Sequence, residues 1–364
     1  MVEESIATFE TFCRHQDMVA LAAEQGIANQ YREVVRIYAG FADSTPSSSS
    51  KASQSPPIAF RWRNAGLRAI KAVVSTDGLA ADGGESLRTT LPVILGTLYT
   101  GESDVLVSLQ ARLQAPGTSE IDPTRRRTSV ANVPTVDAAN GDAAVASQSA
   151  ADVDRKTEMD VRLLALRCLE RIVVSGSNRG QIRIATTVVL RFILTKDPIR
   201  PKGDLQATKS DISDNWATSL MELIAKWCPV QVRFVILVTA MELLLEIHPV
   251  EKVLEKPFTI VYLIDWLLKS QVNMIGLSVM DVLLGLLHYI SLSLAPQEAK
   301  DTPENAGAES RQDPAHAQES SISLQRKELL LLLETCIGSL ATHIYYGDQV
   351  ADLVRATLSR LKPP

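Results

Sequence analysis

The sequence has few aromatic residues and no excess of basic charge. Aromatic side chains make up 5% of its 364 residues, and its formal net charge is −5 at pH 7. A nucleic-acid-binding protein needs a dominant basic surface to contact phosphates, and a single-strand binder also needs aromatic rings on which bases can stack. The composition therefore argues against nucleic acid as a partner of this protein.

Cysteine and histidine are also scarce, and their positions form no metal-binding or disulfide pattern. The four cysteines, Cys13, Cys168, Cys228 and Cys336, are far apart, and no CxxC pair occurs. This spacing fits neither a disulfide framework nor a zinc site, so we expect a reduced protein on the cytosolic side, with no metal and no cofactor. Cys13 and His15 lie on one predicted helix, where they would point about 200° apart and could not act together.

The sequence also lacks the short motifs that mark common catalytic sites. It contains no HExxH, GxSxG or GxxxxGK[ST] motif, and no GxGxxG motif that follows a strand. The glycines of SGSNRGQ (175–181) resemble a phosphate-binding loop, but no strand precedes them and no Lys-Ser/Thr pair follows. A turn between two helices is the better interpretation, and we expect the protein not to be an enzyme.

Apolar residues recur at the spacing of an α-helix along nearly the whole sequence, and no segment alternates convincingly at the two-residue period of a strand. In VRLLALRCLERIVV (161–174), for example, Leu166, Leu169 and Val173 fall on one stripe. The pattern predicts an all-α fold, with helices at residues 5–22, 31–41, 59–76, 86–100, 102–114, 161–174, 179–195, 216–227, 230–247, 258–270, 273–294, 322–341 and 343–361.

Four polar segments interrupt this helical pattern, at residues 43–57, 115–157, 196–213 and 296–320. They have too few large apolar groups to offset the entropy that a chain loses on ordering, so we predict mobile loops. The chain is thereby divided into N-terminal helical repeats, a disordered linker, central helical repeats, a second disordered loop and a C-terminal helical pair. These parts cover residues 1–114, 115–157, 158–295, 296–320 and 321–364.

Loops of this length are rare inside a compact bundle, but they can protrude from the rim of a solenoid, in which each helix pair packs only on its neighbours. A faint internal repeat supports a solenoid. The segments QIR (181–183) and QVR (231–233) each open a strongly apolar helix, and LR (67–68) opens another. HEAT and armadillo repeats recur about every 40–47 residues. We therefore predict an armadillo/HEAT-like helical-repeat solenoid, with a closed helical bundle as the alternative.

A short basic segment, TRRRTSV, places Arg125, Arg126 and Arg127 directly before Thr128 and Ser129. Two arginines at the −3 and −2 positions before a serine form the pattern that basophilic kinases favour, so Ser129 and Thr128 are candidate phosphorylation sites. A phosphate would add about −1.5 to −2 charges and largely neutralise the arginines. The arginines are also a candidate surface for anionic lipid. The alternative is a solvated basic spot in a mobile loop.

A second basic segment, RWRNAGLRAIK, carries Arg61, Arg63, Arg68 and Lys71. On a helix, Arg61 and Arg68 are seven residues apart and share one face, with Lys71 close by. These residues form a candidate basic surface for a membrane or an acidic partner. The alternative is the solvated side of a helix, which is the usual place for a group of charges.

The apolar segment NMIGLSVMDVLLGLLHYISLSL (273–294) has about the length of a membrane-spanning helix. Asp281 would lie near its centre, at a cost of about 2.5–3.5 kcal/mol on insertion scales. Ser278, Asp281, Gly285 and His288 also form a narrow polar face, which a solenoid helix can turn toward a neighbouring helix or a groove. We therefore predict a buried repeat helix and no transmembrane span.

Seven sequence blocks, taken together, carry a family resemblance: VEESIATFETFC (2–13), YREVVRIYAGFA (31–42), RWRNAGLRAIK (61–71), TRRRTSVANVPTVD (124–137), NRGQIRIAT (178–186), WATSLMELIAKWCPVQVRFVILVTAMELL (216–244) and NMIGLSVMDVLLGLL (273–287). In this order they resemble the fungal Efr-three family, whose name abbreviates Eighty-five-requiring and whose fly relative is called rolling blackout. The resemblance implies an armadillo/HEAT-like rod that is peripheral to the cytoplasmic face of the plasma membrane. It also implies no catalytic activity, and recruitment of a phosphatidylinositol 4-kinase through a tetratricopeptide-repeat adaptor, which supports phosphatidylinositol 4-phosphate synthesis.

The sequence departs from the family pattern at both ends. The resemblance implies an N-terminal region that carries a basic patch, or palmitoylated cysteines in animal members, and a long C-terminal part implicated in adaptor contact. We expect both parts to be absent from this sequence. We therefore expect the chain to be cytosolic if the N-terminal region is required for anchoring. A soluble HEAT/armadillo interaction adaptor without a membrane role, importin-like or phosphatase-scaffold-like, is the alternative function.

Overall fold

The computed structural model describes residues 2–43, 56–114, 150–176, 178–200, 215–247, 254–270, 272–294, 314–344 and 347–361. Within these ranges the chain forms fourteen α-helices and one short 3-10 helix, and it contains no strand. The all-α prediction is therefore confirmed for the described part of the chain. The predictions for loop residues 44–55, 115–149, 201–213 and 296–313 lie outside the described residues.

Twelve of the helices form two rows that lie side by side. The first row contains α1 (Val2–His15), α4 (Pro56–Val74), α7 (Ala150–Val174), α9 (Trp216–Trp227), α11 (Glu255–Lys269) and α13 (Pro314–Leu340). The second row contains α3 (Gln25–Asp43), α5 (Glu85–Leu98), α8 (Arg179–Lys196), α10 (Phe234–Glu246), α12 (Val279–Leu294) and α14 (Gly347–Leu361). Each helix packs on the next helix of its row.

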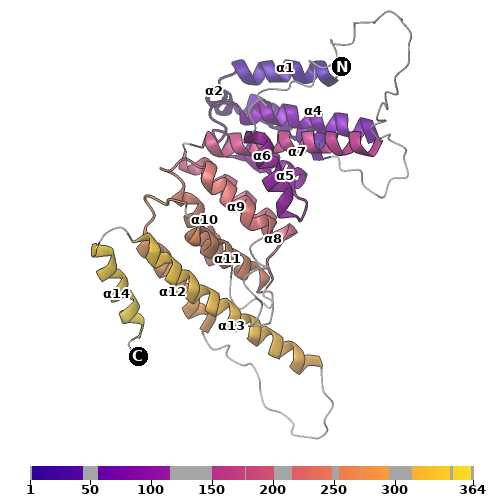
Figure 1. Cartoon of the computed structure of the whole chain (residues 1–364). Coiled ribbons are helices and arrows are strands. Elements are labelled where there is room, and N and C mark those ends of the chain that lie inside the picture. Colours follow the sequence, from indigo (N-terminus) through magenta and orange to yellow (C-terminus); the bar gives the residue numbers. More distant parts are fainter. Residues whose placement is uncertain are drawn as a thin grey trace, which may run out of the picture.

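The rows also pack against each other, through α3 on α4, α5 on α7, α10 on α11 and α12 on α13. Two further helices are additions to the rows: α2 (Met18–Ala23) packs on α3, and α6 (Ser103–Gln114) packs on α7 and α9. Figure 1 shows the stack running from the indigo N-terminal end to the yellow C-terminal end. The first and last pairs lie at opposite ends and do not close into a bundle, so the predicted helical-repeat solenoid is confirmed.

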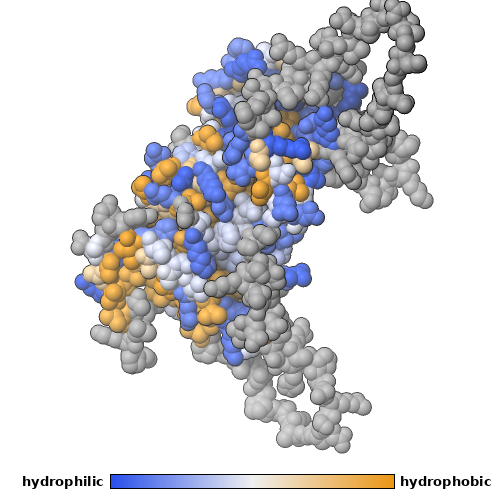
Figure 2. Space-filling view, in the orientation of Figure 1, coloured by the Kyte–Doolittle hydropathy of each residue, from blue (hydrophilic) through white to orange (hydrophobic). Residues whose placement is uncertain are grey.

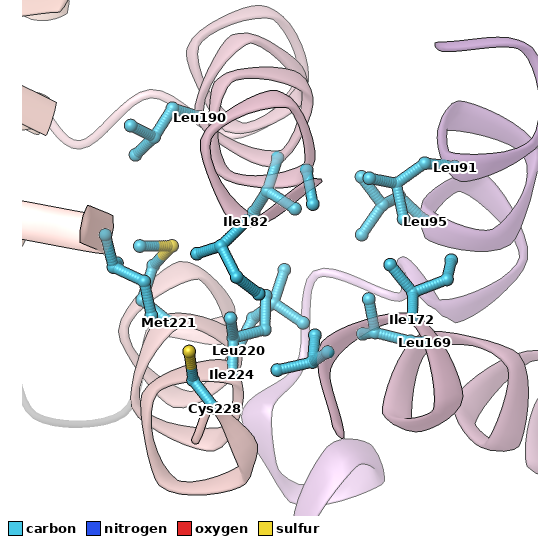
Figure 3. Packing of buried hydrophobic residues seen from close by; sticks show 14 of the residues in the cluster. Leu91, Leu95, Leu169, Ile172, Ile182, Leu190, Leu220, Met221, Ile224 and Cys228 are labelled. Carbon is cyan, nitrogen blue, oxygen red and sulfur yellow. The ribbon is translucent and has the colours of Figure 1, made fainter. Parts of the chain in front are cut away.

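One hydrophobic core runs through the stack. Helix α9 illustrates how the sequence builds it, because Trp216, Leu220, Met221 and Ile224 recur at three- to four-residue spacing and are all buried. Burying a large apolar side chain stabilises a protein by about 1.5–3 kcal/mol. Figure 3 shows Leu220, Met221 and Ile224 of this stripe within the cluster to which buried side chains of α5, α7 and α8 also belong. The labelled residues are Leu91, Leu95, Leu169, Ile172, Ile182, Leu190, Leu220, Met221, Ile224 and Cys228.

Long polar side chains from the QIR and QVR segments cap the C-terminal ends of two first-row helices. Gln181 Nε2 donates to the Ile172 carbonyl at 2.8 Å, at the end of α7. Arg233 donates to the Cys228 carbonyl at 2.9 Å, at the end of α9, and to the Asn273 carbonyl at 3.2 Å. Carbonyls at a helix C-terminus have no partner within the helix, so these bonds satisfy groups that would otherwise be unpaired. The two segments therefore occupy equivalent places, each at the C-terminal end of a first-row helix. The capping residue is Gln181 in the first segment and Arg233 in the second.

Several helix boundaries differ from the predicted ones, and α3 begins six residues earlier than predicted. The segment 5–22 forms two helices instead of one, because Asp17 Oδ1 accepts from the Val19 amide at 2.9 Å and starts α2 as its N-cap. Residues 150–157 and 314–320, predicted as loop, belong to the first turns of α7 and α13. These turns contain good helix formers but no apolar stripe, so a method that reads the stripe misses them.

Helix α12 begins six residues later than predicted, after a turn in which Gly276 has a φ of +86° that favours glycine. The prediction that its polar face meets a neighbouring helix or groove is wrong for Ser278, Asp281 and His288, which are exposed to solvent. Gly285 does face α10, since an added Cβ would lie 2.7 Å from Met241 Cε. Among the described residues, no helix combines the length and the apolar character needed to cross a membrane.

Candidate functional site

The predicted basic surface on α4 is paired with acidic residues of α1. Arg61 Nη2 lies 3.2 Å from Glu3 Oε1, and Arg68 Nη2 lies 3.2 Å from Glu10 Oε1. Each pair joins residues that are 58 positions apart, so the seven-residue step on α4 matches a seven-residue step on α1. The two arginines do share a face, as predicted, and that face points toward α1.

Arg63 does not lie on the predicted surface. Arg63 is only 8% exposed, and its Nη1 atom lies 2.8 Å from Glu158 Oε2 on α7. Glu158 also accepts from Arg162 Nε at 3.0 Å, so one carboxylate joins two guanidinium groups between α4 and α7. The physical reason is helical geometry. Residues two positions apart on a helix point about 200° apart, so Arg63 faces away from Arg61. Lys71 is half-buried on the same helix.

Replacing Arg63 with alanine is expected to lower the free energy of unfolding by about 2–3 kcal/mol. The substitution would leave the half-buried Glu158 carboxylate with Arg162 as its remaining ion-pair partner. Urea denaturation followed by circular dichroism measures the change. The matched control is Arg61→Ala, which removes an exposed ion pair and is expected to cost less than about 0.5 kcal/mol. Equal costs for the two substitutions would contradict the structural role given to Arg63.

The other predicted site residues, Arg125, Arg126, Arg127, Thr128 and Ser129, lie outside the described residues. The structure therefore leaves the phosphorylation site and the basic cluster of this segment as predictions.

The structure reveals a buried polar cluster between α11 and α13 that sequence reasoning missed. Asp265 is 5% exposed, accepts from Ser339 Oγ at 2.7 Å, and lies 2.5 Å from Lys269 Nζ. The buried His343, whose Nε2 is 2.8 Å from the Leu268 carbonyl, caps the end of α11. A single aspartate within the apolar run TIVYLIDWLLK was the available signal. These contacts join neighbouring layers, and the Asp265 carboxylate is already paired with a cation and a hydroxyl.

The cysteines are free and buried, which leaves them poor nucleophiles. Burial raises the pKa of the Cys13 thiol to about 11, that of Cys168 to about 12 and that of Cys228 to about 11. Burial also raises the pKa of Cys336. Because the thiolate is the reactive form, these protonated thiols are inert near neutral pH. His15 is exposed while Cys13 is buried, so the two side chains point apart as predicted.

A small hollow, open to solvent, lies beside α2 and α3. Met18, Leu21 and Leu79 contribute apolar side chains to its lining, and Asp82 and Ser86 contribute polar ones. The Asp82 carboxylate already accepts from the Ser86 amide at 2.8 Å and from Ser86 Oγ at 2.6 Å, which caps the start of α5. The polar residues of the hollow therefore serve to cap a helix, and its apolar residues serve in packing. Across the described ranges, no group of three or more His, Cys, Asp or Glu side chains could hold a metal ion.

Comparison with known proteins identifies the family. Residues 183–305 match the family model described as EFR3 protein, a range that begins in α8 and includes all of α12. Over its whole length, the chain is 57% identical to Protein efr3 of Aspergillus oryzae and 55% identical to Protein efr3 of Emericella nidulans. This sequence belongs to the EFR3 family. Protein EFR3 of Coccidioides immitis is 45% identical, again over the whole chain.

The EFR3 family is the Efr-three family that the seven sequence blocks resemble, so that resemblance is confirmed. The chain covers 31%, 31% and 30% of these three EFR3 relatives, so it spans about a third of their length. No solved structure matches the chain.

Proposed function

We propose that this chain is a non-catalytic helical scaffold segment of a membrane-associated EFR3-family protein. The observation that carries the proposal is the two-row stack itself, whose buried polar side chains serve as helix caps and as contacts between layers. Extended solenoids offer long surfaces on which partner proteins bind. Membership of the EFR3 family supports the membrane association.

The proposed partner is a phosphatidylinositol 4-kinase complex, which the scaffold recruits to the cytoplasmic face of the plasma membrane through a tetratricopeptide-repeat adaptor. Support for this partner comes from the family resemblance of the sequence blocks. In this role the chain supports phosphatidylinositol 4-phosphate synthesis by holding the kinase at its lipid, and it needs no catalytic group of its own.

The proposed membrane contact is the arginine cluster of residues 125–127. On α4, by contrast, Arg61, Arg63 and Arg68 each have a glutamate partner, so they have less charge to offer to a lipid surface. A lysine or arginine near an anionic membrane contributes about 1 kcal/mol. Phosphorylation of Ser129 would place about −1.5 to −2 charges beside the cluster and weaken the contact.

Flotation with phosphatidylserine vesicles at low salt tests the membrane contact. Replacing residues 125–127 with glutamine is expected to weaken vesicle binding by about 100-fold, because three contacts of about 1 kcal/mol are lost. The matched control replaces three exposed arginines of the described helices, Arg36, Arg88 and Arg355, with glutamine, which makes the same change in net charge. Equal loss in both triple variants would overturn the assignment to residues 125–127. Failure of the unsubstituted chain to float would overturn the membrane contact itself.

A binding assay with purified components tests the scaffold role separately. The chain is expected to retain the tetratricopeptide-repeat adaptor and, only when the adaptor is present, the lipid kinase. Retention of nuclear-transport or phosphatase subunits without the adaptor would instead favour the alternative of a soluble HEAT/armadillo adaptor.

A further inference from the structure

Three consecutive turns between the two rows contact one another along one edge of the stack. They join α7 to α8, α9 to α10 and α11 to α12. The Arg179 guanidinium lies over the Phe234 ring, 5.2 Å from its centroid, and links the first turn to the second. Arg233 Nη1 donates to the Asn273 carbonyl at 3.2 Å and links the second turn to the third. Figure 1 shows the first-row helices ending on the left of the view, where these turns follow.

Each of the three turns exposes a large aliphatic side chain. Val174 is 49% exposed, Val230 is 37% exposed and Ile275 is 56% exposed. Because each stands on its own turn, the three form a row of separate apolar tips and not the continuous ridge of one helix. Figure 2 shows apolar, orange residues beside hydrophilic, blue ones on the left of the same view.

The same turns are basic. Residues 171–182, 226–236 and 269–278 contain five lysines or arginines and no aspartate or glutamate. Arg171 and Arg179 are exposed, and neither has a carboxylate partner among the described residues. Positive charge is therefore available beside the apolar tips. We call this surface the turn edge, and its members are Arg171, Val174, Arg179, Val230, Arg233 and Ile275.

The neighbouring turn toward the N-terminal end of the stack has a different character. Residues 75–84, which join α4 to α5, contain Asp77 and Asp82 and no lysine or arginine. The large apolar residue of this turn, Leu79, is 5% exposed. Exposed apolar tips and positive charge thus occur together on three turns and are both missing from residues 75–84. Their combination is a property of the turn edge and not of every turn in this fold.

We propose that the turn edge contacts an anionic membrane surface, with its apolar tips at the boundary of headgroups and acyl chains and its arginines among the headgroups. Proteins that lie on a membrane combine these two kinds of residue, because apolar burial and attraction to anionic lipid both contribute to binding. A partner helix would instead need a continuous ridge or groove. The proposal rests on the proposed membrane association, and it adds a second contact to the one proposed for residues 125–127.

Vesicle flotation tests the apolar tips with a triple variant. Val174→Ser, Val230→Ser and Ile275→Ser together are expected to weaken binding to phosphatidylserine vesicles by about tenfold, because three apolar side chains no longer enter the lipid. Circular dichroism is expected to show an unchanged helix content, since all three positions are exposed. The matched control, which is expected to bind as the parent does, changes to serine three exposed apolar residues outside the three turns: Val107, Leu331 and Val354.

An environment-sensitive dye tests the same contact by position. The four native cysteines are all buried, so an introduced cysteine can be labelled selectively. Ile275→Cys carrying the dye NBD is expected to gain more than about twofold in emission when phosphatidylserine vesicles are added, because the dye leaves water for the lipid boundary. Val107→Cys on α6, labelled in the same way, is the control and is expected to keep its emission.

The outcomes separate this contact from the proposed membrane association. If the unsubstituted chain floats but the emission at position 275 does not change and the triple variant binds as well as its control, the turn edge is not the contact, while the association itself stands. Failure of the unsubstituted chain to float would overturn both. A gain in emission with soluble polyglutamate and none with vesicles would assign the turn edge to an acidic protein segment and would reject the lipid contact.

Discussion

Replacing Gly66 with alanine is expected to lower the free energy of unfolding by about 3 kcal/mol. An added Cβ at this position would lie 2.5 Å from the Ala42 amide nitrogen and 2.6 Å from the Tyr38 carbonyl oxygen. Both atoms belong to the backbone of α3, so no change of side-chain rotamer can relieve the overlap. Overpacking a core with one methyl group costs about 1–3 kcal/mol, and a clash with backbone atoms falls at the upper end of that range.

The matched control is Gly40→Ala, on the helix that faces Gly66. Nothing lies within 4 Å of a Cβ added there. Alanine is a better helix former than glycine by about 0.5–1 kcal/mol, so this substitution is expected to raise the free energy of unfolding. Urea denaturation of both variants compares the two effects. If Gly66→Ala were also stabilising, α3 and α4 could not approach as closely as the structure places them.

The contrast between Gly40 and Gly66 shows what the sequence could and could not predict about the fold. Both glycines lie within segments of helical period, and nothing local distinguishes them. The sequence predicts α9 with its observed ends, because a strong apolar stripe coincides with an N-cap, Asn215, whose Oδ1 accepts from the Ala217 amide at 2.8 Å. The close approach of α3 to α4 is a tertiary contact, which no periodic pattern encodes.

In the candidate site, too, the sequence predicts what depends on local helical pattern and does not predict contacts between helices. The sequence predicts that Arg61 and Arg68 share a face, because that depends only on helical geometry. It does not reveal the partner of Arg63, since Glu158 lies 95 residues away on a different helix. The burial of Asp265 also depends on a distant residue, Ser339 of α13. Local pattern thus predicts helices and their faces, while the partners across layers come only from the structure.

Replacing Trp216 with alanine is expected to have the largest effect, a loss of about 3–5 kcal/mol in the free energy of unfolding. Trp216 is fully buried at the start of α9. Its ring meets that of Tyr99 edge to face, with centroids 5.1 Å apart, and lies 6.1 Å from that of Phe192 on α8. Tyr99 follows the end of α5, so one side chain joins three helices of the stack.

Trp216→Phe separates the contribution of ring volume from that of the indole N–H. The Trp216 Nε1 atom is buried and has no hydrogen-bond partner among the described residues. Phenylalanine removes this unpaired donor while keeping a six-membered ring against Tyr99 and Phe192, so it is expected to cost about 1–1.5 kcal/mol. Urea denaturation curves of Trp216→Ala and Trp216→Phe compare the two losses in the free energy of unfolding. If phenylalanine cost as much as alanine, the N–H would have to make a bond that stabilises the stack, and packing alone could not account for the burial of Trp216.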